Sequence, residues 1–166
     1  MLCSLSVVAG TADIQGLALV SINSKRVNLE LDQAVLITDK TATFIGFDDF
    51  GGEVFRISFS DKGMYIAVKG ELLYAKTNQF QKILSIPLTQ EEFLQIMQFR
   101  IDDNAFVERI KEDGVIVWKK KTHKKVSVIF RDFMKTKSKR LYPKKTTISY
   151  KKNSFDLTWV KFKKVR

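Results

Sequence analysis

Short runs of alternating apolar and polar residues occupy most of the chain, and this pattern favours strands over any other element. In residues 54–59, Phe55, Ile57 and Phe59 would share one face of an extended strand. Comparable runs occur at residues 17–37, 43–47, 64–69, 105–111, 115–119, 126–130, 146–150 and 155–159. Several of them are separated by turns that contain Gly, Asp or Asn. Runs this short, with so many turns, predict an antiparallel meander.

One helix is predicted, over residues 89–99. Thr89 and Glu92 have the spacing of a capping box, in which each side chain accepts a hydrogen bond from the backbone amide of the other. Phe93 and Ile96 follow three residues apart, so they would share one face of the helix.

Two predicted strands, at residues 43–47 and 115–118, are apolar on both faces. Both faces then need cover, and one helix covers little. A sheet that curls around its own apolar cavity, with the helix as a lid, meets this requirement. We therefore predict a mainly β fold, a curved antiparallel half-barrel with a helical lid. The length of 166 residues suits one domain, so we expect a single β domain at residues 13–166 after an N-terminal segment at residues 1–12.

Large apolar residues on these strands and on the helix are the candidates for the wall of the cavity. They are Phe44, Phe47, Phe55, Ile57, Phe59, Met64, Phe93, Met97 and Trp118. Ordinary core packing is the alternative for each of them, because the same residue types fill solid cores. A dry cavity could hold acyl chains without catalytic groups, since moving a lipid chain out of water gains about 0.8 kcal/mol per methylene.

The net charge of +11 is concentrated in the last third of the chain. Residues 1–110 carry a balance of −4, and residues 111–166 carry +15. This asymmetry indicates an anionic partner, either nucleic acid or a phospholipid surface. The candidate contacts are Lys119, Lys120, Lys121, Lys124, Lys125 and, in a predicted basic loop at residues 134–143, Lys137, Lys139 and Arg140. The alternative is that these side chains only keep one face of the sheet soluble.

The groups that catalysis requires are scarce. His123 is the only histidine and sits in a lysine-rich turn, and Cys3 is the only cysteine, so neither a Cys/His pair nor a disulfide is expected. A metal site of the usual Cys and His type lacks ligands, and we expect no cofactor. We predict a binding protein, not an enzyme.

The order of several short motifs resembles the LolB family of outer-membrane lipoprotein receptors, over roughly residues 13–164. The motifs are Asp49-Phe50-Gly51-Gly52 at a hairpin tip, Ile86-Pro87-Leu88 at the helix entry, Leu141-Tyr142-Pro143, and Phe155-Asp156-Leu157-Thr158-Trp159 near the end. The resemblance implies a half-open barrel that accepts acylated lipoproteins from a periplasmic carrier of the LolA type and delivers them to the outer membrane. It also implies that Phe50, with Gly51 and Gly52, forms the loop for membrane insertion or lipoprotein release.

The resemblance further implies a location at the periplasmic face of the outer membrane, with Cys3 as the candidate site of acylation. Residues 1–10 lack the basic start of a secretory signal, so no export signal is visible in this sequence. We expect a monomer. Two other hypotheses remain open: a basic nucleic-acid-binding β domain, with Tyr142, Tyr150 and Trp159 available for stacking, and a structural module with a filled core.

Overall fold

The computed structural model describes residues 14–69, 71–75, 77–100, 105–111, 113–135 and 141–163. The side chains of residues 72–80 and 163 are outside this description. The elements in chain order are β1 (Ile14–Asn23), β2 (Asn28–Ile37), β3 (Thr41–Phe47), β4 (Glu53–Ser60), β5 (Gly63–Val68), β6 (Glu71–Ala75), α1 (Thr77–Leu84), α2 (Gln90–Gln98), β7 (Phe106–Ile110), β8 (Ile116–Lys120), β9 (Ser127–Lys135), β10 (Leu141–Tyr150) and β11 (Asn153–Lys163).

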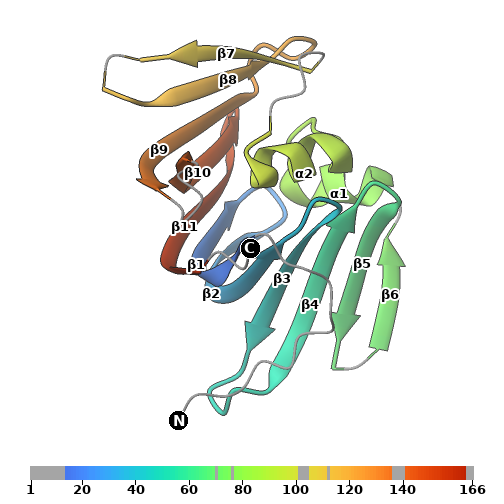
Figure 1. Cartoon of the computed structure of the whole chain (residues 1–166). Coiled ribbons are helices and arrows are strands. Elements are labelled where there is room, and N and C mark those ends of the chain that lie inside the picture. The colour runs from blue at the N-terminus through green and yellow to red at the C-terminus, as the bar shows by residue number, and fades with distance from the viewer. Residues whose placement is uncertain are drawn as a thin grey trace.

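The eleven strands found in the described residues form one antiparallel sheet, in the order β6-β5-β4-β3-β2-β1-β11-β10-β9-β8-β7. The chain therefore winds outward from β1 to the edge strand β6, crosses to the opposite edge at β7, and winds back to β11, which pairs with β1. The crossing segment carries both helices. Figure 1 shows α1 and α2 together between the two halves of the curved sheet. The sheet remains open, because β6 and β7 are its two ends.

The predicted helix is confirmed as α2, and its N-terminus has the predicted capping box. The Glu92 amide donates to Thr89 Oγ1 over 3.1 Å, and the Thr89 amide donates to Glu92 Oε2 over 2.8 Å. Phe93 and Ile96 are buried. The helix ends at Gln98, and the following residue Phe99 caps it with a left-handed backbone (φ 52°) that stops further helical turns.

Helix α1 was not predicted, and the sheet has more cover than the sequence indicated. Helix α1 packs against β5 and β11, while α2 packs against β3 and β4. The predicted basic loop is also shorter than expected: β9 continues to Lys135 and β10 begins at Leu141. Pairing between β9 and β10 extends these strands, because Leu141 lies opposite Lys135 and satisfies the backbone there.

An irregularity between β1 and β11 adds curvature at the centre of the sheet. The register shifts between Leu17 and Ala18, so β11 has one residue more than β1 at this point. The neighbouring Gly16 is required for the close approach: a Cβ atom there would lie 2.0 Å from the Lys161 carbonyl oxygen.

The interior contains two groups of aromatic side chains. Phe44, Phe59, Phe93 and Phe155 form one group under the helices. The other lies beneath β8–β10, where the rings of Phe99 and Trp118 stack with centroids 5.6 Å apart and planes 1° from parallel.

The two-sided apolar pattern of residues 43–47 has a structural explanation. Phe44 faces the main core, and Ile45 faces the other side of the sheet, where it is buried with Ala34 and Leu36.

Candidate functional site

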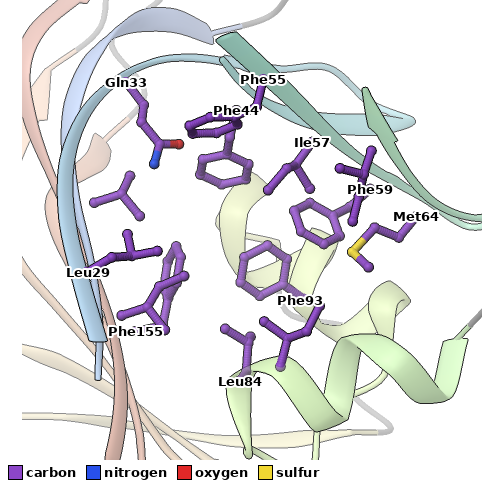
Figure 2. Close-up of a pocket in the computed structure, with 14 residues that line it drawn as sticks. Leu29, Gln33, Phe44, Phe55, Ile57, Phe59, Met64, Leu84, Phe93 and Phe155 are labelled. Atoms are coloured by element: carbon purple, nitrogen blue, oxygen red, sulfur yellow. The ribbon is translucent and has the colours of Figure 1, made fainter. Parts of the chain in front are cut away.

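An apolar cavity of about 100 Å³ lies between the first five strands, β11 and the helices. The residues that line it come from both ends of the described chain, as Figure 2 shows. They are Val20, Ile22, Leu29, Gln33, Phe44, Phe55, Ile57, Phe59, Met64, Ile66, Ile83, Leu84, Phe93 and Phe155. Helix α1 contributes two of them and α2 contributes Phe93, so the helices form part of the cavity wall.

Aromatic edges form the floor of the cavity. The ring centroids of Phe59 and Phe93 are 5.0 Å apart, and those of Phe93 and Phe155 are 5.2 Å apart. Phe44 closes the group at 5.8 Å from Phe59, with the two rings edge to face. Each of these four rings is at most 7% exposed. Edge-to-face contacts of this kind hold aromatic side chains in defined orientations.

The rim of the cavity is formed by lining residues that are only half-buried. They are Ile22, Leu29, Phe55, Ile57, Ile66 and Ile83. These residues lie on β1, β2, β4 and β5 and at the end of α1, so the cavity opens between the sheet and α1. The ring of Phe55 lies over Gly46, where a Cβ atom would be 2.1 Å from that ring. Glycine at position 46 therefore leaves the space that the Phe55 ring occupies.

Gln33 is the only lining residue with a polar side chain. It lies on β2 opposite Ala18 and is 5% exposed. Figure 2 shows its amide directed into the cavity beside Phe44. Nothing in the sequence alone distinguished Gln33 from the other polar residues of β2, because its neighbours Asp32 and Glu30 are exposed.

The predicted cavity residues divide into two sets. Six of the nine line the cavity: Phe44, Phe55, Ile57, Phe59, Met64 and Phe93. The other three lie elsewhere. Phe47 is 37% exposed near the hairpin tip, Met97 is buried on α2, where its carbonyl accepts a hydrogen bond from Tyr142, and Trp118 stacks on Phe99. Sequence reasoning did not assign the lining residues of β1, β2 and β11 to the cavity. They alternate as strand residues do, but most of the residues that they meet in the cavity lie far from them in the sequence.

Phe50 projects from the tip of the β3–β4 hairpin and is 97% exposed. The tip is held by Asp48, whose Oδ1 accepts hydrogen bonds from the amides of Phe50 (3.0 Å) and Gly52 (2.7 Å). Gly51 has a φ of 82°, which glycine adopts without strain. The backbone of the tip is thus ordered by its own hydrogen bonds while the Phe50 side chain contacts solvent.

The basic side chains expected to meet an anionic surface differ in exposure. Lys121, Lys124 and Lys125 are exposed, and Lys119 is half-buried. Lys120 is buried: its Nζ donates to the Pro87 carbonyl (2.8 Å) and to Glu92 Oε2 (2.7 Å). Lys137, Lys139 and Arg140 lie outside the described residues.

A basic pocket of about 360 Å³ lies at the β7–β8 hairpin. It is lined by Val107, Arg109, Lys119, Lys120, Lys121 and Lys124. Arg109 joins the predicted lysines here because β7 and β8 pair, with Val107 opposite Lys119.

The described residues contain no cluster of His, Cys, Asp and Glu side chains that could hold a metal ion. His123 is exposed in the loop after β8, and Cys3 lies outside the described residues. No helix in the described ranges is both long and apolar enough to cross a membrane.

These features define a protein with an open, curved antiparallel sheet, an apolar interior cavity and a cover of two short helices, and this confirms the fold class predicted from the sequence. The fold is of the LolA/LolB type. A solved structure that is similar to this chain is a domain from Vibrio parahaemolyticus, assigned as an outer membrane lipoprotein-sorting protein domain. The TM-score is 0.56 at 9% sequence identity, over 93% of this chain and 86% of the other. No protein-family model matches the chain, and no curated protein matches it in sequence.

Proposed function

We propose that this protein is a LolB-like, non-enzymatic acceptor of acylated lipoproteins that holds acyl chains in its cavity and delivers them to the outer membrane. The observation that carries the proposal is the apolar cavity of about 100 Å³ beneath the helices. The fold shared with a lipoprotein-sorting domain supports the same class of cargo.

The cavity offers hydrocarbon a favourable environment. Cavities of this size that are lined by aliphatic and aromatic side chains stay dry and bind small apolar molecules. Each methylene transferred from water contributes about 0.8 kcal/mol. A whole acyl chain is larger than the cavity, so its entry requires the half-buried rim to move, above all Ile83 on α1 and Phe55 on β4.

Phe50 supplies the release step in this proposal. A fully exposed phenylalanine on an ordered tip has no protein contact to lose when it enters a bilayer. Burying it in an apolar environment is worth about 2 kcal/mol, roughly a thirtyfold change in an equilibrium. The β7–β8 hairpin lies at the opposite end of the sheet from the β3–β4 tip (Figure 1), so the exposed lysines of the β8–β9 loop, worth about 1 kcal/mol each at an anionic surface, would act separately from Phe50. We place the protein at the periplasmic face of the outer membrane, where a carrier of the LolA type would supply the cargo.

A transfer assay with Phe50→Glu tests the proposal. The protein is loaded with a synthetic triacylated lipopeptide and mixed with vesicles of phosphatidylethanolamine and phosphatidylglycerol. Phe50→Glu should bind the lipopeptide as wild type does and transfer it to vesicles at least about tenfold more slowly. Val160→Glu is the matched control, because Val160 is also apolar and 61% exposed but lies on β11.

Two results would contradict the proposal at different points. Wild-type protein that fails to bind the lipopeptide removes the acceptor function itself. A folded Phe50→Glu protein that transfers at the wild-type rate removes only the role of the hairpin tip.

The nucleic-acid hypothesis receives less support from the side chains. Two of the aromatic residues suggested for base stacking, Tyr142 and Trp159, are 4% and 1% exposed. Tyr150 is half-buried beneath Lys151. Stacking platforms for single strands need open aromatic faces. Salt-sensitive binding to oligonucleotides, with no binding to anionic vesicles, would reverse this preference.

A further inference from the structure

The amide of Gln33 is a polar group that borders the apolar cavity (Figure 2). The residue is 5% exposed, and none of the side-chain hydrogen bonds found among the described residues involves it. Gln98, which is buried to a similar degree, differs: its Nε2 donates to the Thr38 carbonyl over 2.7 Å. An amide that faces apolar side chains has both its donor and its acceptor available to whatever occupies the cavity.

The other residues that line the cavity offer the Gln33 amide no polar side chain to bind. All thirteen other residues that line the cavity are apolar, and none of the fourteen carries a charge. A leucine or methionine at this position would fill the same space without the cost of burying an amide. Gln33 is therefore suited to a ligand that brings its own polar atom into an otherwise apolar space.

The kind of polar group that the ligand should carry follows from two facts: the cavity offers an amide, and none of its lining residues is charged. An amide can donate to a carbonyl oxygen through Nε2, and it cannot neutralise a carboxylate. A free fatty acid would have to bury its charge without a cationic partner, which is strongly unfavourable. An ester or amide carbonyl is neutral, accepts a hydrogen bond and is attached to hydrocarbon.

We propose that Gln33 binds the ester or amide carbonyl of a bound acyl chain, and so makes the cavity selective for neutral acyl groups over plain hydrocarbons and free fatty acids. This inference rests on the proposed function. It also orients the ligand: the carbonyl lies at β2, and the tail extends past Phe44 towards Phe59 and Met64 on the opposite wall (Figure 2). Leu31, two residues before Gln33 on the same strand face, is 42% exposed, so this face of β2 opens to solvent towards the N-terminal end of the strand.

The test compares an ester with an alkane of the same number of heavy atoms, methyl hexanoate and nonane. Binding of each vapour-equilibrated ligand is measured for wild type and for Gln33→Met, and the quantity of interest is the ratio of ester to alkane affinity. Comparing this ratio between proteins cancels the different water solubilities of the two ligands. We expect it to fall on the order of tenfold in Gln33→Met, as the loss of one buried hydrogen bond predicts.

Gln90→Met is the matched control. Gln90 is 3% exposed and its Nε2 has no partner among the described residues, but it lies on α2 outside the cavity lining. Its substitution should leave the ratio unchanged. A second measurement needs no variant: on wild type, the side-chain amide proton resonances of Gln33 should shift on adding the ester and stay in place on adding nonane.

The outcomes separate the inference from the function on which it rests. If both ligands bind and the ratio is the same in wild type and Gln33→Met, or if the Gln33 resonances respond equally to both ligands, the carbonyl role is wrong and the cavity remains a hydrocarbon site. If wild type binds neither ligand, the proposed function fails and this inference fails with it.

Discussion

Replacing Ile57 with phenylalanine should stabilise the protein and weaken ligand binding at the same time. Ile57 is a half-buried residue of the cavity rim on β4, and it lies opposite Phe44 in the register with β3. A larger side chain at this position would project into the cavity. If the cavity serves ligand binding, filling it should raise the stability of the protein and lower its affinity for the ligand. Changes in these opposite directions would identify the cavity as a binding site.

The magnitude follows from the cavity volume. Residual cavities cost about 24 cal/mol per Å³, so a cavity of about 100 Å³ lowers the free energy of unfolding by about 2.4 kcal/mol relative to a filled interior. Phenylalanine adds roughly one or two methylene equivalents to isoleucine, which recovers about 1 kcal/mol. For a domain of this size the melting temperature should rise by roughly 2–4 °C.

Urea unfolding and nonane binding measure the two effects on the same sample. We expect the urea midpoint of Ile57→Phe to rise and its nonane affinity to fall at least about fivefold. Ile110→Phe is the matched control, because Ile110 is 74% exposed on the edge strand β7 and its enlargement should change neither quantity.

Two results would refute the reasoning. Unchanged nonane affinity in a stabilised Ile57→Phe protein would mean that the ligand does not occupy the cavity. A loss of about 1–3 kcal/mol of stability would mean that the new ring is overpacked, and hence that the space is not available to a side chain.

Three further perturbations test the structure around the site. Lys120→Met should cost about 3 kcal/mol in urea unfolding, because it leaves the Glu92 carboxylate partly buried without its cation, and adding Glu92→Gln should restore much of the loss. Gly16→Ala should abolish cooperative thermal unfolding, since its Cβ would collide with a carbonyl of β11; retention of a wild-type melting curve would disprove the close approach. The hydrogen bond from Lys145 lowers the pKa of Asp132, so an NMR titration should give a midpoint below the usual range for aspartate, and the midpoint should rise in Lys145→Met. Wild type should therefore be more stable than Lys145→Met at neutral pH, and this difference in stability should be lost as the pH falls through the wild-type midpoint.

The elements that were predicted well are those with strong local signals. The capping box of Thr89 and Glu92 is complete within four residues of sequence, and the structure has both of its hydrogen bonds. The alternation of Phe55, Ile57 and Phe59 likewise holds in β4, and all three line the cavity. Such patterns are decided by neighbours in sequence, so no knowledge of the fold is needed to find them.

Helix α1 shows where local signals were overlooked. Phe80, Ile83 and Leu84 have helical spacing, but the segment follows a strand without a strong start signal. The composition of this segment, with Thr, Asn and Gln at its start, is compatible with a loop as well as with a helix. The helix forms where the chain must cross from edge strand β6 to edge strand β7, and that crossing becomes visible only when the strand order is known.

The role of Lys120 shows the same limit for the basic residues. In sequence it is one of five lysines around a turn, and nothing separates it from Lys119 or Lys121. The pairing of β8 with β7 and β9 turns its side chain inward, where it reaches the Pro87 carbonyl and Glu92 at the start of α2. Whether a lysine contacts solvent or a carboxylate thus depends on a partner twenty-eight residues away.

The sequence alone determined that this chain forms a meander of strands with a capped helix and an exposed aromatic residue at a hairpin tip, because alternation, capping and turn formation act over a few residues. The tertiary structure decided that the sheet stays open, that β1 pairs with β11, and that Gln33 lines the same apolar cavity as the phenylalanines of β3, β4, α2 and β11. These outcomes depend on residues more than a hundred positions apart, such as Val20 and Phe155, which meet only when the whole sheet has curved.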